Sequence, residues 1–395
     1  MVYQPLYIAS TLKSEITSTS FTPPPSMLDT SPSFLLHTAV KPHINDQTKA
    51  KEKPLSHCPV TIIVPAYNEE SCIADTINSL LSQSLIAEHI IVIDDGSTDD
   101  TAAICRSLSV TVITPPENTG SKAGAQNFAL THINTPYTLA IDADTTLEHN
   151  ALEKLYAAMN ERDVVAVCGF VIPQRVNTLW ERGRYVEYLM AFTFYKEIQS
   201  YYEKPLISSG CFSLFRTEYL KQIGGWSLRT MAEDMDLTWT AYQLGKKVRF
   251  VPDAICYPIE PHNFHFMRKQ LKRWAHGFIQ NVKLHRKGIL RVPFLRSIVT
   301  VMCWDASIAS IFYLTVIPIL SVTVSPLFLL GYIIDLPMVV VPTLVKAYSR
   351  GETWKALTSI PAFMVLRVVN SAIFLEALFK ELILKKPLTT YEKGH

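Results

Sequence analysis

Apolar runs alternate with amphipathic stretches over residues 60–141. Residues 60–64 form a β-branched run that stops at Pro65, which predicts a buried strand. The same patterns predict strands at 90–93, 110–113 and 137–141, and helices at 70–84, 98–108 and 124–131. Strands that alternate with helices indicate an α/β fold in which helices wrap both faces of a mostly parallel sheet.

The C-terminal third of the chain has a different pattern. Residues 306–325 carry no charge over 20 positions, enough to cross a bilayer core of about 30 Å. A second apolar stretch, 326–345, is interrupted only by Asp335, and a third, 360–384, contains several charged residues. We predict membrane segments at about 298–322 and 326–345, with 360–384 as a third hydrophobic segment. A buried core helix is the alternative for each.

Positive charges set the expected orientation of these segments. Basic residues precede the first segment and follow the second: Arg286, Lys287, Arg291 and Arg296, then Lys346, Arg350 and Lys355. Such residues favour the cytoplasmic side, so we expect a multi-pass membrane protein with a cytoplasmic catalytic domain and two crossings. A third crossing would leave Lys385 and Lys386 outside. The third segment is therefore expected in the interface or re-entrant.

Composition narrows the class of protein. A net charge of +2 argues against bulk nucleic-acid binding. The seven cysteines are scattered without a Cys-x-x-Cys pair, which favours reduced thiols over a disulfide framework or zinc site. Residues 1–56 are rich in Ser, Thr and Pro and lack a long apolar run, so they read as a flexible leader.

Two further stretches combine aromatic and basic residues. Residues 264–290 have the pattern of a basic amphipathic helix with an aromatic side, which suits a membrane surface. Residues 180–202 are similar but could equally belong to the core. We therefore divide the chain into a leader (1–56), a catalytic domain (57–290) and a membrane region (291–395).

Polar residues cluster where the predicted strands end, which is where open α/β sheets bind ligands. The first strand leads into Pro65, Tyr67 and Glu69, whose backbone and side chains could reach a base and ribose. A helix cap is the alternative. Asp94 and Asp95 follow the second strand and could hold a pyrimidine N–H and ribose hydroxyls, or simply form an Asp-Gly turn.

The next two strand ends suit a diphosphate. The stretch 118–127, with its glycines and Lys122, opens a helix, and a helix N-terminus with a lysine favours phosphate, although the spacing is not that of a Walker A loop. Asp142 and Asp144 follow the strand at 137–141. Their carboxylates are hard oxygen ligands that could bridge Mg²⁺ or Mn²⁺ to a diphosphate. A solvated Asp-x-Asp is the alternative.

The last two motifs complete a pattern for sugar transfer from a nucleotide diphosphate. The acidic pair Glu233-Asp234 could deprotonate an acceptor hydroxyl. In the box Gln270-x-x-Arg273-Trp274, the arginine could meet the leaving diphosphate and the tryptophan could stack on a sugar face. A helix N-cap and an ordinary amphipathic surface are the alternatives for the two motifs taken singly.

With these motifs in order, residues 58–290 resemble family 2 inverting glycosyltransferases with a GT-A domain. The resemblance is greatest to membrane-bound poly-β-1,6-N-acetylglucosamine synthases, with hyaluronan, chitin and cellulose synthases more distant. It implies that Asp95 contacts the base, that Asp142 and Asp144 bind the metal–diphosphate, and that Asp234 is the catalytic base. It also implies an acceptor-side strand at 208–216, which includes Gly210, and closure of Gln270, Arg273 and Trp274 over diphosphate and acceptor.

The resemblance implies a UDP-sugar as the donor. It also implies an acceptor at a membrane, either a growing glycan or a lipid-linked sugar. The chain departs from the synthases in its polar leader and short membrane region, so export of a polymer would need an oligomer or a partner subunit. Transfer of one sugar to a lipid or other membrane acceptor is one alternative, and a catalytically silent nucleotide-sugar-binding subunit is another. The intact Asp142, Asp144, Asp234 and Arg273 weigh against the silent subunit. The sequence leaves the sugar itself open.

Overall fold

The computed structural model describes residues 56–390 except 197–198, 200–203 and 335. The predicted leader therefore lies outside the described residues, apart from Ser56. The strands are β1 Ser56–Ala66, β2 Leu85–Asp94, β3 Thr111–Ile113, β4 Tyr137–Ile141, β5 Thr145–Leu147, β6 Val164–Val171, β7 Phe212–Arg216 and β8 Lys247–Pro258.

These strands form one eight-stranded sheet in the order β3-β2-β1-β4-β7-β6-β8-β5. The four strands predicted from the sequence are confirmed, and they pair in parallel at one side of the sheet. The pair β6 and β8 is also parallel. However, β7 runs antiparallel to both β4 and β6, and β5 runs antiparallel to β8, so the sheet is mixed.

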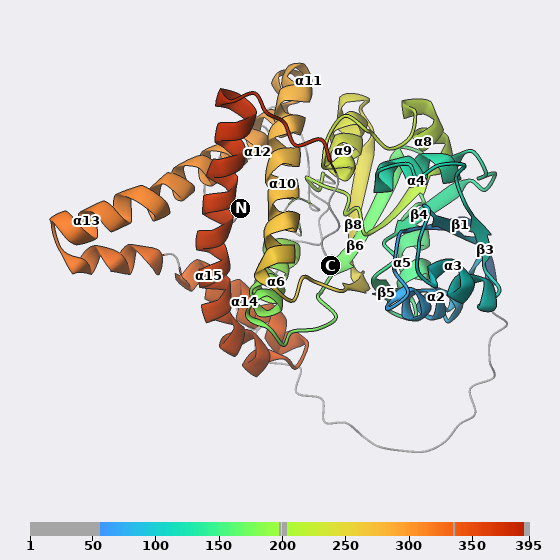
Figure 1. The fold of residues 1–395 in the computed structure, drawn as a ribbon, viewed down its shortest axis with the longest axis horizontal. Helices are drawn as coiled ribbons and strands as arrows, with labels where there is room; N and C mark the ends of the chain where they lie inside the picture. The colour runs from blue at the N-terminus through green and yellow to red at the C-terminus, as the bar shows by residue number, and fades with distance from the viewer. Residues whose placement is uncertain (1–55, 197–198, 200–203, 335, 391–395) are drawn as a thin grey trace, which may run out of the picture. The chain divides into compact units, whose positions relative to one another are not determined.

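Helices cover the sheet and extend from it (Figure 1). Those of the predicted catalytic domain are α2 Ile73–Leu81, α3 Thr101–Ser107, α4 Lys122–Leu130, α5 Ala151–Ala157, α6 Leu179–Met190, α8 Thr217–Ile223, α9 Glu233–Gln243, α10 Phe264–Leu284 and α11 Arg286–Arg291. The helices predicted at 70–84, 98–108 and 124–131 correspond to α2, α3 and α4. All eight residues of β6 are buried, as expected for a strand with both sheet faces covered.

Three long apolar helices follow, at Pro293–Thr323, Pro326–Ser349 and Thr353–Ile383, each long and apolar enough to cross a membrane. The first comprises α12 Pro293–Trp304 and α13 Ile317–Thr323 with π-helical turns at Asp305–Ala309 and Phe312–Val316 between them. The second comprises the 3₁₀ turn Pro326–Tyr332 and α14 Leu336–Ser349, and the third comprises α15 Thr353–Leu378 and the π-helical turn Phe379–Ile383. The predicted segments fall within these helices to within one residue. Asp335 lies outside the described residues.

Candidate active site

The loops after β1 and β2 are tied to each other. Asn68 has a left-handed backbone (φ 55°), and its Oδ1 accepts a hydrogen bond from Thr98 N at 2.8 Å. Ser97 Oγ in turn accepts a bond from Asn68 N at 3.0 Å, and Thr101 Oγ1 accepts one from Glu69 N at 2.7 Å. These bonds fix the strand ends at which the sequence predicts nucleotide binding.

Asp94 and Asp95 are both buried at the end of β2. The two oxygens of Asp95 accept hydrogen bonds from Thr119 N and Thr119 Oγ1, each at 2.8 Å. Asp94 Oδ1 accepts one from Ser97 N at 3.1 Å. Asp95 thus joins the strand end to the loop before α4. A nucleotide base that contacted Asp95 would have to share its carboxylate with Thr119. Tyr67, which directly follows β1, is 44% exposed.

Lys122 lies among the carboxylates rather than facing solvent. Ser121 caps α4 by accepting a bond from Gly124 N, which places Lys122 at the first helical position. The Lys122 ammonium donates to Gly210 O at 2.9 Å, forms an ion pair with Asp142 and lies 3.9 Å from Glu233 Oε1. A single cation therefore links α4, the end of β4 and the start of α9.

The acidic pair begins α9, where the helix N-terminus favours negative charge. Asp234 Oδ2 accepts a hydrogen bond from Gly210 N at 3.0 Å. A Cβ atom at Gly210 would lie only 3.1 Å from that same oxygen, so a glycine allows the backbone this close to the carboxylate. The structure thus brings together five predicted site residues: Lys122, Asp142, Gly210, Glu233 and Asp234.

This environment changes the acidity of Asp234. Burial, reinforced by the neighbouring Glu233 carboxylate, raises the pKa of Asp234 from 3.8 to about 6, although Lys122 and the Gly210 and Met235 amides act in the opposite direction. The folded state therefore holds this proton to a higher pH than the unfolded chain does. As the pH rises from about 4 to about 6, this group lowers the free energy of unfolding. A pKa of about 6 fits the role of general base that the sequence predicts for Asp234.

If Asp234 is the catalytic base that the sequence predicts, it must be ionised to accept a proton, so we expect kcat/KM to rise with pH along a limb centred near pH 6. Glu233→Gln should move that limb to lower pH, since it removes the negative charge that raises the pKa of Asp234. The measurement is the pH profile of kcat/KM for both proteins. A limb that stays in place, or moves upward, in Glu233→Gln would contradict this assignment.

Asp142 and Asp144 follow β4 and remain the candidate metal ligands. Thr145 Oγ1 donates a hydrogen bond to Asp144 Oδ1 at 3.0 Å, while Asp142 pairs with Lys122. Within the described residues, no cluster of three His, Cys, Asp or Glu side chains could hold a metal ion. Mg²⁺ is commonly bound by one or two carboxylates plus substrate phosphates, so the two aspartates suit a cation that arrives with a diphosphate.

The helix that carries the Gln-x-x-Arg-Trp box, α10, packs directly against the segment leading into the acidic pair. A Cβ atom at Gly277 would lie 2.6 Å from Ala232 Cβ and 2.8 Å from Ala232 N, so only a glycine permits this approach. The fully buried Asn281 donates from Nδ2 to Ala232 O and to Thr230 Oγ1, each at 3.0 Å. The position of α10 and that of Asp234 are therefore mechanically linked.

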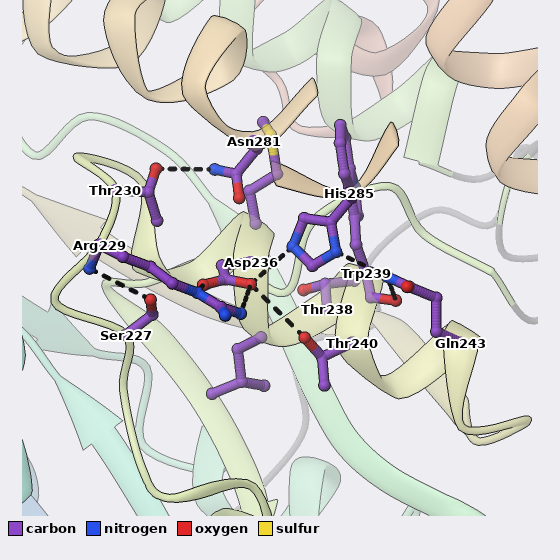
Figure 2. Close-up of polar contacts among 12 residues, drawn as sticks. Ser227, Arg229, Thr230, Asp236, Thr238, Trp239, Thr240, Gln243, Asn281 and His285 are labelled. Carbon is purple, nitrogen blue, oxygen red and sulfur yellow. Dashed lines mark hydrogen bonds and ion pairs between the residues drawn. The ribbon is translucent and has the colours of Figure 1, made fainter. Parts of the chain in front are cut away.

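A network centred on the buried Asp236, on the far side of α9, strengthens this link (Figure 2). Asp236 accepts hydrogen bonds from Arg229 Nε and Nη2, each at 3.0 Å, and pairs with His285 Nε2 at 2.6 Å. Burial raises the pKa of Asp236, but the bonds from His285 and Arg229 outweigh it and hold the pKa well below its usual value. Asp236 and Asp234 are about 200° apart around the helix, so one faces the site and the other its support.

The box itself has a defined but different environment. The Cζ atom of the buried Arg184 guanidinium lies 4.4 Å from the centroid of the Trp274 ring. The same atom lies 4.3 Å from the centroid of the Tyr188 ring. Arg184 Nε also pairs with Glu260 at 3.1 Å. Arg184 thus orients Trp274. The sequence analysis did not predict this role for Arg184. Stacking of Trp274 on a sugar, and the roles of Gln270 and Arg273, stay predictions.

Comparison with known proteins shows which family part of this chain matches. Residues 61–224 match the family model described as glycosyl transferase family 2. A poly-β-1,6-N-acetyl-D-glucosamine synthase of Staphylococcus epidermidis is 27% identical over 223 residues, 55% of this chain and 54% of that protein. The synthase of the same name from Staphylococcus aureus is 27% identical over 225 residues, again 55% and 54%. The chain thus matches about half the length of these relatives.

Among solved structures, the fold is similar to that of the mannosyltransferase PcManGT from Pyrobaculum calidifontis, solved with GDP-Man and Mn²⁺. The TM-score is 0.53 at 20% identity, over 83% of this chain and 88% of that one. At this identity the similarity speaks for the fold alone. Residues 61–224 therefore match glycosyl transferase family 2, and the chain has a fold similar to that of a solved glycosyltransferase.

Proposed function

We propose that this chain is a membrane-bound inverting glycosyltransferase that transfers a sugar from a UDP-sugar to a growing β-linked polysaccharide. The observation that carries the proposal is the convergence of Asp234, Glu233, Lys122, Asp142 and Gly210 at the carboxyl end of β4. The family match and the names of the staphylococcal relatives support it, and those names make N-acetylglucosamine the proposed sugar.

In the proposed reaction, ionised Asp234 accepts the proton of an acceptor hydroxyl as its oxygen attacks the anomeric carbon of the donor sugar. The new C–O bond forms on one face while the bond to UDP breaks on the other, so the anomeric centre inverts. An α-linked UDP-sugar then gives a β-linkage. General-base assistance of this kind contributes about 10²–10⁴-fold to the rate.

The proposed diphosphate side uses positive groups of this chain. Lys122, at the start of α4, would exchange part of its contact with Asp142 for the diphosphate, and Arg273 would approach from α10. Asp142 and Asp144 would hold Mg²⁺ or Mn²⁺, which when bound neutralises charge on the departing diphosphate. Mn²⁺ in the structure of the Pyrobaculum calidifontis mannosyltransferase supports a divalent cation.

The proposed acceptor side involves Gly210, Gln270 and Trp274, with Trp274 held by Arg184 as a platform for a sugar ring. The acceptor is proposed to be a glycan or a lipid-linked sugar at the membrane, and the catalytic domain to face the cytoplasm. Export of a polymer is proposed to involve an oligomer or a partner subunit.

Membranes containing the full chain should release UDP from UDP-N-acetylglucosamine faster than from UDP-glucose or UDP-glucuronic acid, and should not release GDP from GDP-mannose. The measurement is nucleotide release with each donor and Mn²⁺, against membranes that contain Asp234→Asn. Release from GDP-mannose alone would overturn the UDP-sugar assignment. Equal nucleotide release by membranes with the wild type and with Asp234→Asn would contradict the proposal that this chain is the enzyme that releases it.

A further inference from the structure

Three side chains on one face of α10 contact a single carboxylate from the end of the third long helix, which runs beside α10 (Figure 1). Glu381 Oε1 accepts a hydrogen bond from Gln280 Nε2 at 2.8 Å and pairs with His276 Nδ1 at 2.9 Å. Its Oε2 pairs with Lys283 Nζ, also at 2.9 Å. At about 100° per residue, positions 276, 280 and 283 lie within about 60° of each other around α10. Glu381 therefore binds one stripe of that helix.

The carboxylate of Glu381 is closed off from solvent. The Glu381 and His276 side chains are each only 1% exposed, whereas Lys283 is 45% exposed. Burial of a carboxylate is costly unless its oxygens are bonded, and here side chains of a single helix supply the bonds. The same bonds therefore fix the carboxylate and the side chains of α10 that reach it.

Gln280 extends this connection to the segment before the acidic pair. Its Nε2 donates to Glu381 and, at 2.9 Å, to Leu388 O, while its Oε1 accepts a hydrogen bond from Met231 N at 2.9 Å. Met231 lies three positions before Asp234. The oxygen and nitrogen of a side-chain amide share one plane, so the bonds that orient Nε2 also orient Oε1. One side chain thus links the end of the third helix to the segment that leads into Asp234.

This segment packs closely on α10. Gly277 and Asn281, on the neighbouring stripe of the helix, contact Ala232, and Gln280 lies between that stripe and the one that meets Glu381. Loss of the Gln280 amide would leave the Met231 N–H without its acceptor, so the segment would have to shift to find another. A displacement of about 1 Å at a catalytic group can cost about 10²-fold in rate.

We propose that Glu381 and Gln280 are positioning residues for sugar transfer: through Gln280, the end of the third long helix sets where the Asp234 carboxylate lies. The proposal rests on the proposed function, because it gives both residues a role in that reaction. The residues proposed to bind the nucleotide lie at the ends of β1, β2 and β4, away from these bonds. The coupling should therefore act on kcat and not on the affinity for the donor.

A double-mutant cycle in membranes that contain the full chain tests this coupling. Gln280→Leu, Glu381→Leu and the variant with both changes are compared for kcat and for equilibrium binding of UDP-N-acetylglucosamine. We expect each single change to lower kcat by up to about 10²-fold with donor affinity unchanged. The double variant should lose no more than Gln280→Leu alone. Losses that multiply in the double variant, or a fall in donor affinity as large as the fall in kcat, would overturn the proposal.

Glu352, just before the start of the same helix, provides the matched control. Its carboxylate also accepts from several side chains, among them Tyr185 OH of α6 and Lys355 Nζ, each at 3.0 Å. Because these bonds lie at the other end of the helix, Glu352→Leu combined with Gln280→Leu should give the product of the two separate losses. If this pair also fails to multiply, the effect is a general loosening of the helix, and the specific role of Glu381 is overturned.

Glu381→Gln keeps the test decisive if Glu381→Leu does not fold. Its amide oxygen can still accept from Gln280 and His276, and Lys283 keeps its bond to the backbone carbonyl of residue 381 at 2.8 Å. We expect kcat close to that of the wild type, and a loss as large as that of Gln280→Leu would overturn the proposal. Absence of UDP release by the wild type would instead overturn the proposed function.

Discussion

Asp234→Asn is expected to lower kcat for sugar transfer by at least about 10²–10⁴-fold while leaving the affinity for UDP-sugar nearly unchanged. The asparagine Oδ1 can still accept the hydrogen bond that Gly210 N donates to Asp234, so the backbone arrangement should persist. What the amide cannot do is take a proton from the acceptor. The measurement is single-turnover kinetics together with equilibrium binding of the UDP-sugar.

Glu233→Gln is the matched control, because it changes the adjacent carboxylate in the same way. It should retain more turnover than Asp234→Asn at the pH optimum of each protein. If Asp234→Asn bound UDP-sugar far more weakly but turned over normally at saturation, Asp234 would be a ligand and Glu233 the better candidate for the base.

Asp144→Ala is expected to abolish turnover supported by Mg²⁺ or Mn²⁺, because it removes one of the two carboxylates proposed to hold the cation against the diphosphate. It should also weaken Mn²⁺ binding measured by electron paramagnetic resonance in the presence of UDP, a readout that does not depend on turnover. Asp253→Ala, which removes an exposed carboxylate on β8, is the control and should leave both unchanged. Full activity of the wild type in excess chelator would overturn the metal assignment.

The part of the fold that could be predicted from the sequence is the part governed by local periodicity. Strands β1 and β2 contain the β-branched runs at 60–64 and 90–93, each followed by turn-forming residues, so two strands of one sheet could be predicted there. The antiparallel strand β7 was not predictable in the same way. Its placement between β4 and β6 depends on contacts between residues far apart in the chain.

The same distinction applies to the site. The carboxylates were found because they follow strands or begin a helix, which are positions visible in the sequence. Their supports were not: Asp236 depends on His285, 49 residues later, and Trp274 depends on Arg184, 90 residues earlier. A closer reading of α9 could have suggested that Asp236 faces away from Asp234, since they are two residues apart on a helix. It could not have named the partner.

The central claim is transfer of a sugar from UDP with inversion, and analysis of the product tests it most directly. Membranes that contain the full chain are incubated with UDP-N-acetylglucosamine and Mn²⁺, and the product is sized and its anomeric configuration is determined by NMR. We predict a β-linked polymer that is absent with Asp234→Asn. A single sugar on an extractable lipid would replace polymer synthesis by single transfer, and an α-linkage, or no transfer from any UDP-sugar, would contradict the central claim.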